Sequence, residues 1–158
     1  MIKLNLIVCD NLSSLVAHAG ESSTYLWCLY FDGACKGKGK VGSCGIFIYT
    51  SERNAILLGV ILGDHLSNNI AEYQALLIGL KALLLLGATN VHVFGNSQLV
   101  VHQFHGHART LHPLMHYYSL LARDLFAHFV SSSLIFLPRQ ENKVAHSLAL
   151  MALSGSFA

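Results

Sequence analysis

The sequence has few charged residues, almost no proline and no long uninterrupted apolar run. Charged residues make up 11% of the 158 residues, and there are 2 prolines, whereas an average soluble domain is roughly 25% charged. The longest apolar stretch, from Ala75 to Ala88, contains Lys81 and is shorter than the roughly 20 residues that a membrane-spanning helix needs. We therefore expect no membrane partner. The length fits a single α/β domain with a buried core.

Paired cysteines and a secretion signal are also lacking. The four cysteines form no CxxC pair and no disulfide framework, which indicates reduced thiols. The N-terminal segment is a poor signal peptide, because polar residues break its short apolar run. We expect an intracellular protein of the nucleus or cytoplasm that is not secreted. Residues 1–24 are predicted to be an arm or linker, residues 25–154 one domain and residues 155–158 a tail.

Positive charge is sparse but locally concentrated. The net charge of +2 is too small to indicate a nucleic-acid partner by itself. Lys36, Lys38 and Lys40 alternate with glycines in one short segment. Such a segment is either a solvated turn or a small basic patch.

The pattern of apolar, β-branched and turn residues predicts strands followed by alternating helices and strands. The predicted strands cover residues 27–31, 44–50, 55–62, 91–94 and 134–137. The predicted helices cover residues 70–86, 98–105, 113–129 and 142–153. A loop is expected over residues 34–42, an N-cap at Asn68 and Asn69, and a C-cap at Gly87. This order predicts a mixed five-stranded sheet, with a three-strand antiparallel meander plus parallel strands and helices on both faces.

Three polar residues are expected to meet at one edge of this sheet. Asp32 ends the first predicted strand, Asn96 follows the fourth, and Glu72 lies one turn into an otherwise apolar helix. An unpaired charge on such a helix is expensive, so the grouping indicates a metal site. Each residue also has a structural explanation, as a turn residue for Asp32 and as a helix N-terminal charge for Glu72.

Four segments in this order resemble the ribonuclease H type 1 domain, in the version carried by plant LTR-retrotransposon polyproteins. The segments are WCLYFDGACKGKG, NNIAEYQALLIGLKALLLLG, VFGNSQLVVHQFHG and LPRQENKVAHSLALMA. With their spacing they cover most of the chain, from about residue 25 to residue 153. Four motifs at domain-scale spacing are far more specific than one short pattern.

The resemblance implies hydrolysis of the RNA strand of RNA/DNA hybrids with two Mg²⁺ ions. It implies that Asp32 bridges the two ions and that Glu72 helps to hold one of them. It also implies that Asn68, Asn69 and Gln98 contact the hybrid backbone in its minor groove, where 2′-hydroxyl groups distinguish RNA from DNA. A reverse transcriptase domain of a parent polyprotein is an expected partner, and the domain is expected to be a monomer.

Two of the implied catalytic positions depart from the family pattern. Asn96 and His146 stand where the family has its third and fourth aspartates. Loss of two carboxylates is expected to lower the rate at least ~10³-fold, since each ~1.4 kcal/mol is tenfold. His146 prefers Mn²⁺ or Zn²⁺ to Mg²⁺, so activity with Mn²⁺ is an alternative. No other acidic residue is placed to substitute.

The sequence therefore predicts an impaired hybrid ribonuclease and leaves two alternatives. The first is a pseudoenzyme that binds the hybrid through the lysines, Asn69 and Gln98 without cutting it. The second is an inert retroelement relic. A histidine-rich segment is either a zinc site or a set of exposed side chains, without cysteines to favour zinc. Its members are His102, His105, His107, His112 and His116.

Overall fold

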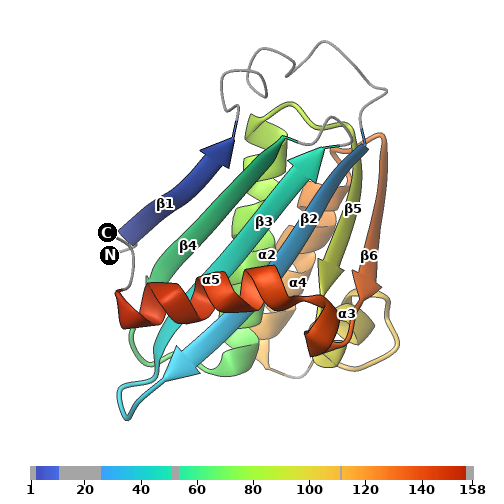
Figure 1. Ribbon diagram of the computed structural model, residues 1–158. Coiled ribbons are helices and arrows are strands. Elements are labelled where there is room, and N and C mark those ends of the chain that lie inside the picture. The colour runs from blue at the N-terminus through green and yellow to red at the C-terminus, as the bar shows by residue number, and fades with distance from the viewer. Residues whose placement is uncertain (1–2, 11–25, 51–53, 111, 156–158) are drawn as a thin grey trace.

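The computed structural model describes residues 3–10, 26–50, 54–110 and 112–155, and it shows one twisted sheet with helices on both faces (Figure 1). The strands are β1 (Lys3–Asp10), β2 (Leu26–Lys36), β3 (Val41–Thr50), β4 (Ala55–Gly63), β5 (Asn90–Gly95) and β6 (Ser131–Phe136). The spatial order is β1-β4-β3-β2-β5-β6. Strands β2, β3 and β4 form the predicted antiparallel meander, and β5 and β6 extend it in parallel.

All five predicted strands are confirmed, and the sheet has one strand more. Strand β1 pairs antiparallel with β4, so the prediction of an arm or linker is wrong for residues 3–10. A register shift between Leu6 and Val8 breaks the strict alternation by which a strand is recognised from sequence. Residues 11–24 and 156–158, predicted as arm and tail, lie outside the described residues.

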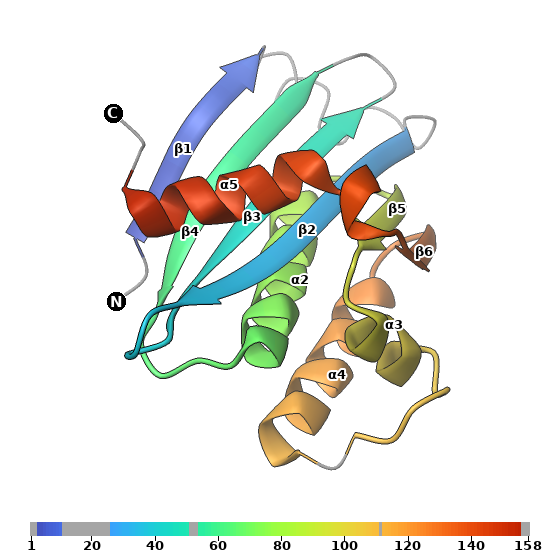
Figure 2. The same cartoon turned by 60° about the horizontal axis from the view of Figure 1, so that its bottom comes forward.

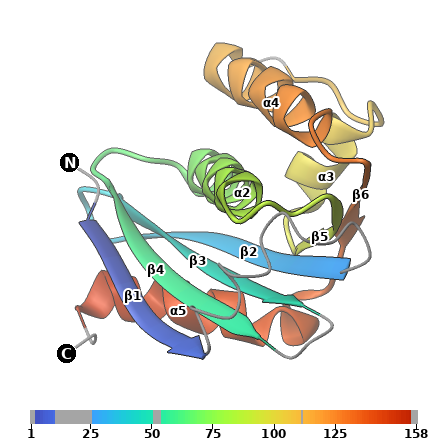
Figure 3. The ribbon, with the colours of Figure 1, turned by 90° about the horizontal axis from the view of Figure 1, so that it is seen from above.

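The helices form a layer on each face of the sheet. They are α2 (Asn68–Leu85), α3 (Gln98–Phe104), α4 (Pro113–Phe126), the short 3₁₀ helix η1 (Arg139–Glu141) and α5 (Lys143–Ser154). Helix α5 crosses β2, β3 and β4 on one face, and α2 lies on the other (Figure 2). Helix α4 packs outside α2 (Figure 3). Within the described ranges, no helix is both long and apolar enough to cross a bilayer.

Two local predictions need correction. The N-cap of α2 is Ser67, whose hydroxyl accepts a hydrogen bond from Ile70 N at 3.2 Å, rather than Asn68 or Asn69. The predicted loop over residues 34–42 is mostly strand, because β2 continues to Lys36 and β3 begins at Val41. Cross-strand pairing thus extends the ladder beyond the apolar run that marks it in the sequence.

The pleat of β2 divides its residues between the two helical layers. Leu29 is fully buried and lies against Gly79 of α2. Asp32 has the opposite parity and points to the other face, toward α5. Because successive strand side chains alternate between faces, β2 contributes a core wall on one side and a polar group on the other.

Candidate active site

The parallel pairing of β2 and β5 brings two predicted site residues together. Phe31 is the register partner of Gly95, the last residue of β5, so Asp32 lies in β2 beside Asn96, which directly follows β5. Asp32 is 1% exposed. A carboxyl group this deeply buried needs partners, because unpaired burial of a charge is costly.

Glu72 reaches the same place from α2, which approaches β2 very closely at Gly33. A Cβ atom on Gly33 would lie 2.4 Å from the Ala71 carbonyl carbon, so only glycine fits there. The Gly33 N–H donates to Glu72 Oε1 at 2.8 Å, while the buried Oε2 has no hydrogen-bond partner. Burial and the nearby Asp32 carboxyl group raise the pKa of Glu72 well above its usual value, against the opposing effects of Gly33 and Arg139.

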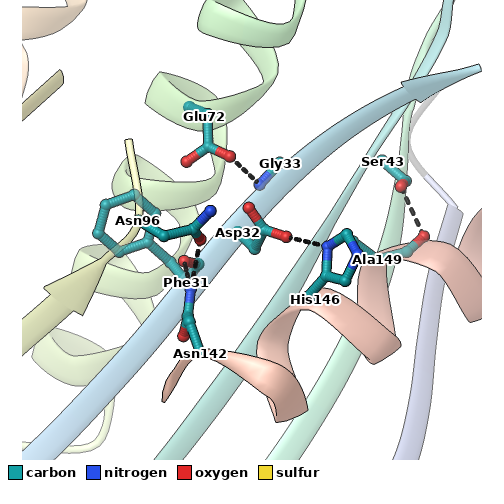
Figure 4. Close-up of polar contacts among 9 residues, drawn as sticks. All are labelled: Phe31, Asp32, Gly33, Ser43, Glu72, Asn96, Asn142, His146 and Ala149. Carbon is teal, nitrogen blue, oxygen red and sulfur yellow. Dashed lines mark hydrogen bonds and ion pairs between the residues drawn. The ribbon is translucent and has the colours of Figure 1, made fainter. Parts of the chain in front are cut away.

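His146 reaches the site from α5, the helix on the other face. Helix α5 can come close because residue 45 of β3 is a glycine. A Cβ atom at this position would lie 1.9 Å from the Ala145 carbonyl oxygen. His146 Nδ1 lies 2.7 Å from Asp32 Oδ2 (Figure 4). Since an ionised carboxylate can only accept, Nδ1 carries the proton in this pair. His146 therefore acts as a hydrogen-bond donor to Asp32.

Asn142, which sequence reasoning missed, fixes the orientation of Asn96. The buried Asn142 Nδ2 group donates to the Phe31 carbonyl oxygen at 2.9 Å and to Asn96 Oδ1 at 2.7 Å. A carbonyl oxygen accepts only, so the nitrogen end of Asn142 must face it, and Asn96 must present its oxygen to Asn142. Figure 4 shows the Asn96 amide nitrogen turned toward Asp32. Asn142 stands in the quoted RQEN motif, and its position just before a helix was the available signal.

These residues do not fit a pair of Mg²⁺ ions. Such a pair needs several anionic oxygen ligands to offset the repulsion between the ions. Here Asp32 Oδ2 is engaged by His146, Asn96 Oδ1 is engaged by Asn142, and burial favours the uncharged form of Glu72. Among the described residues, no group of three or more His, Cys, Asp or Glu side chains is arranged to hold a metal ion.

A cavity of about 360 Å³ lies over this cluster. Its lining includes Asn68, Asn69, Glu72, Asn96 and His146, together with Gly33, Ala34, Cys35, Ser97, Arg139 and Leu150. A second hollow shares Cys35 and Asn68 with it and continues to the basic turn. That hollow is lined by Cys35, Lys36, Gly37, Lys40 and Asn68. The structure thus joins most of the predicted catalytic and nucleic-acid-binding residues in one groove.

Two of the predicted binding residues lie outside the lining of the groove, and one residue that was not predicted lies in it. Lys38 in the β2–β3 turn and Gln98 at the start of α3 are exposed, but neither lines the two hollows. Arg139 of η1 lines the central cavity and was not predicted. Arg139 follows β6 and Pro138 in the chain. The direction of its side chain depends on where η1 packs, which no local sequence pattern reveals.

The histidine-rich segment is largely engaged in local structure. His105 Nε2 lies 2.8 Å from the Leu134 carbonyl oxygen, so it is the donor. His112 Nδ1 accepts from Leu114 N and Met115 N at the start of α4, and this cap was not predicted. His102 and His107 are exposed, with ring centroids 6.2 Å apart. The described part of the segment contains no metal-binding group of three side chains.

Comparison with known proteins agrees with this geometry. The family model described as "Reverse transcriptase-like" matches residues 30–152. Ribonuclease HI of Halobacterium salinarum is 32% identical over 124 residues, covering 78% of this chain and 62% of that protein. The bifunctional protein Rv2228c of Mycobacterium tuberculosis is 30% identical over 126 residues, 79% of this chain but only 35% of that protein. The chain thus spans less than two thirds of the length of these relatives.

Solved structures give the same result. The crystal structure of RNase H1 from Halobacterium salinarum superposes with a TM-score of 0.76 at 31% identity, covering 82% of this chain and 98% of that one. The structure of LC11-RNase H1, solved in complex with an RNA/DNA hybrid, gives a TM-score of 0.73 at 25% identity, covering 84% of this chain and 99% of that one. The chain therefore belongs to the reverse transcriptase-like family and is a ribonuclease H-like domain.

Proposed function

We propose that this chain is a ribonuclease H-type domain that binds RNA/DNA hybrids and hydrolyses their RNA strand only weakly. The observation that carries the proposal is the state of the two replaced positions. His146 Nδ1 is bound to Asp32 Oδ2, and Asn96 Oδ1 accepts a hydrogen bond from Asn142. Neither position offers a free anionic oxygen to a metal ion.

Retained hybrid binding is supported by the groove. Lys36, Lys40 and Asn68 line one hollow, which continues into the central cavity with Asn69. Lysine side chains contact phosphates, and amide side chains suit the hydroxyl-bearing minor groove of a hybrid. LC11-RNase H1, whose fold this chain shares, was solved in complex with an RNA/DNA hybrid.

Weak hydrolysis follows from the chemistry of the site. Two carboxyl groups, Asp32 and Glu72, are present where the family resemblance implies four, and one of them pairs with His146. At ~4 kcal/mol per close charge pair in a partly polar site, even a heavily discounted loss predicts a rate at least ~10³-fold below that of an intact family member.

The test is cleavage of an end-labelled RNA/DNA hybrid by the full chain, beside the double variant Asn96→Asp with His146→Asp. We expect little cleavage by the natural chain in Mg²⁺ or Mn²⁺ and recovery of cleavage in the double variant. A third variant, which adds Asp32→Asn to the double variant, is expected to lose the recovered cleavage. Rapid Mg²⁺-dependent cleavage by the natural chain would refute weak hydrolysis.

Hybrid binding is tested separately, by fluorescence anisotropy at physiological salt. Absence of binding would contradict the proposed function and favour an inert retroelement relic. We further propose that the domain descends from a retroelement polyprotein, in which a reverse transcriptase domain is its natural partner. Co-purification of the chain with the upstream polymerase domain of such a polyprotein would test that partnership.

A further inference from the structure

The central cavity presents hydrogen-bond donors at the position where the family resemblance implies a metal ligand. Asn142 holds the oxygen of Asn96, so the Asn96 amide N–H groups, which Figure 4 shows on the side of Asp32, remain for other partners. Arg139 and Asn69 line the same cavity. Guanidinium and amide N–H groups are ligands for an anion and cannot ligate a cation.

We infer that this cavity accepts a backbone phosphate of the hybrid directly, with no divalent ion between protein and phosphate. This inference rests on the proposed function, because it concerns the same groove and the same nucleic acid. In this arrangement the N–H donors of Asn96 and Arg139 contact the phosphate oxygens. In the arrangement that the family resemblance implies, metal ions bound to carboxylates make these contacts.

The neighbours of Asn96 determine which of its two amide orientations is present. The Phe31 carbonyl oxygen determines the direction of Asn142, and Asn142 determines the direction of Asn96. Reversing Asn96 would place two NH₂ groups against each other at 2.7 Å and would leave a donor without an acceptor. The orientation that leaves the Asn96 N–H groups without a partner in the protein is thus determined by Asn142.

Each carboxyl group at the cavity has a partner for one of its oxygens, whereas the buried Glu72 Oε2 has none. Asp32 is 1% exposed and is bound by His146, and it does not line the cavity. Glu72 lines it but is 7% exposed and uses Oε1 to accept from Gly33 N. Arg139 is exposed and lines the cavity, and its positive charge lowers the pKa of Glu72 against the larger raising effect of burial. An arginine fork can contact two oxygens of one phosphate, and the amides of Asn96 and Asn69 can supply further donors.

The experiment measures hybrid affinity of the full chain by anisotropy of a fluorescein-labelled RNA/DNA duplex, in EDTA and in Mg²⁺ at equal ionic strength. We expect the natural chain to bind equally in both, within about twofold. Arg139→Gln should weaken binding about tenfold in both conditions, as expected for loss of a charge-assisted contact. Lys81→Gln, an exposed change on α2, is the charge-matched control and should leave the affinity unchanged.

Asn96→Asp separates direct phosphate contact from metal-mediated contact. It keeps the side-chain shape and the hydrogen bond from Asn142 but replaces N–H donors by an anionic oxygen. We expect about tenfold weaker binding in EDTA and substantial recovery in Mg²⁺. Asn96→Ala, which adds no charge, should bind weakly in both conditions. Circular dichroism of each variant verifies that it is folded.

The outcomes distinguish the two proposals. Absence of hybrid binding by the natural chain in both conditions would refute the proposed function and, with it, this inference. Binding that rises tenfold or more when Mg²⁺ is added leaves hybrid binding intact and overturns the direct phosphate contact. Unchanged affinity of Asn96→Asp in EDTA overturns it as well.

Discussion

Replacement of His146 by aspartate should destabilise the protein when divalent ions are absent. His146 Nδ1 and Asp32 Oδ2 are 2.7 Å apart, with side chains 28% and 2% exposed. Removing one partner of a fully buried pair costs about 3–5 kcal/mol. Water reaches the more exposed His146 and replaces part of the loss, so we expect about 2–3 kcal/mol. This lowers Tm by roughly 5–10 °C for a domain of this size.

The assay is thermal and urea unfolding in EDTA, followed by titration with Mg²⁺. His146→Asp places a third carboxyl group beside Asp32 and Glu72, so Mg²⁺ should raise the Tm of this variant and leave the natural chain unchanged. His146→Asn is the matched control, because its amide nitrogen can replace Nδ1 as the donor to Asp32. Stability of His146→Asp within about 0.5 kcal/mol of the natural chain in EDTA would refute the role given to this pair.

Three further predictions follow from the same structure. The pKa of Glu72 is raised in the folded state, so protonation of this side chain favours folding. This contribution to stability is complete at pH values below the unfolded pKa and is lost as the pH rises through the folded pKa. Glu72→Gln should therefore increase stability at pH 8 and change it little at pH 4; equal effects at both pH values in urea unfolding would contradict this. Asn142→Ala removes hydrogen bonds to the Phe31 carbonyl oxygen and Asn96 and should cost about 2–3 kcal/mol in urea unfolding; a loss below about 0.5 kcal/mol would show that the network contributes little. Burial raises the pKa of Cys44 to about 12, so at pH 8 this thiol should react with a disulfide reagent only after unfolding, and mass spectrometry of labelled peptides would reveal any earlier reaction.

The fold was predictable because its main elements carry strong local patterns. The β-rich run at Trp27 and the helix-forming run from Ile70 are each consistent with one structure. Strand β1 was missed because the shift between Leu6 and Val8 breaks its alternation. Its place at the edge of the sheet is determined by pairing with β4, a distant segment that no local pattern reveals.

The sequence predicted most of the residues that the candidate site contains but not the hydrogen bonds between them. The ends of adjacent parallel strands predict that Asp32 and Asn96 are neighbours, and the register of β2 and β5 agrees. The directions of the hydrogen bonds at the site could not be predicted, because they depend on contacts between elements that are far apart in the sequence. The donation from His146 to Asp32 requires the close approach of α5 at Gly45. The orientation of Asn96 requires Asn142, whose partner is a main-chain carbonyl 111 positions earlier.

The hydrogen bonds of Asn96 and His146 make aspartate unequally acceptable at the two positions. An aspartate at position 96 could accept the hydrogen bond from Asn142 through one carboxylate oxygen, but its second oxygen would take the place of the amide nitrogen that faces Asp32. An aspartate at position 146 would instead deprive Asp32 of its donor. Aspartate at position 96 thus keeps the hydrogen bond from Asn142, whereas aspartate at position 146 removes one, so we expect the larger loss of folding stability at position 146. Under the proposed function, we therefore expect histidine at position 146 to be retained more strongly than asparagine at position 96.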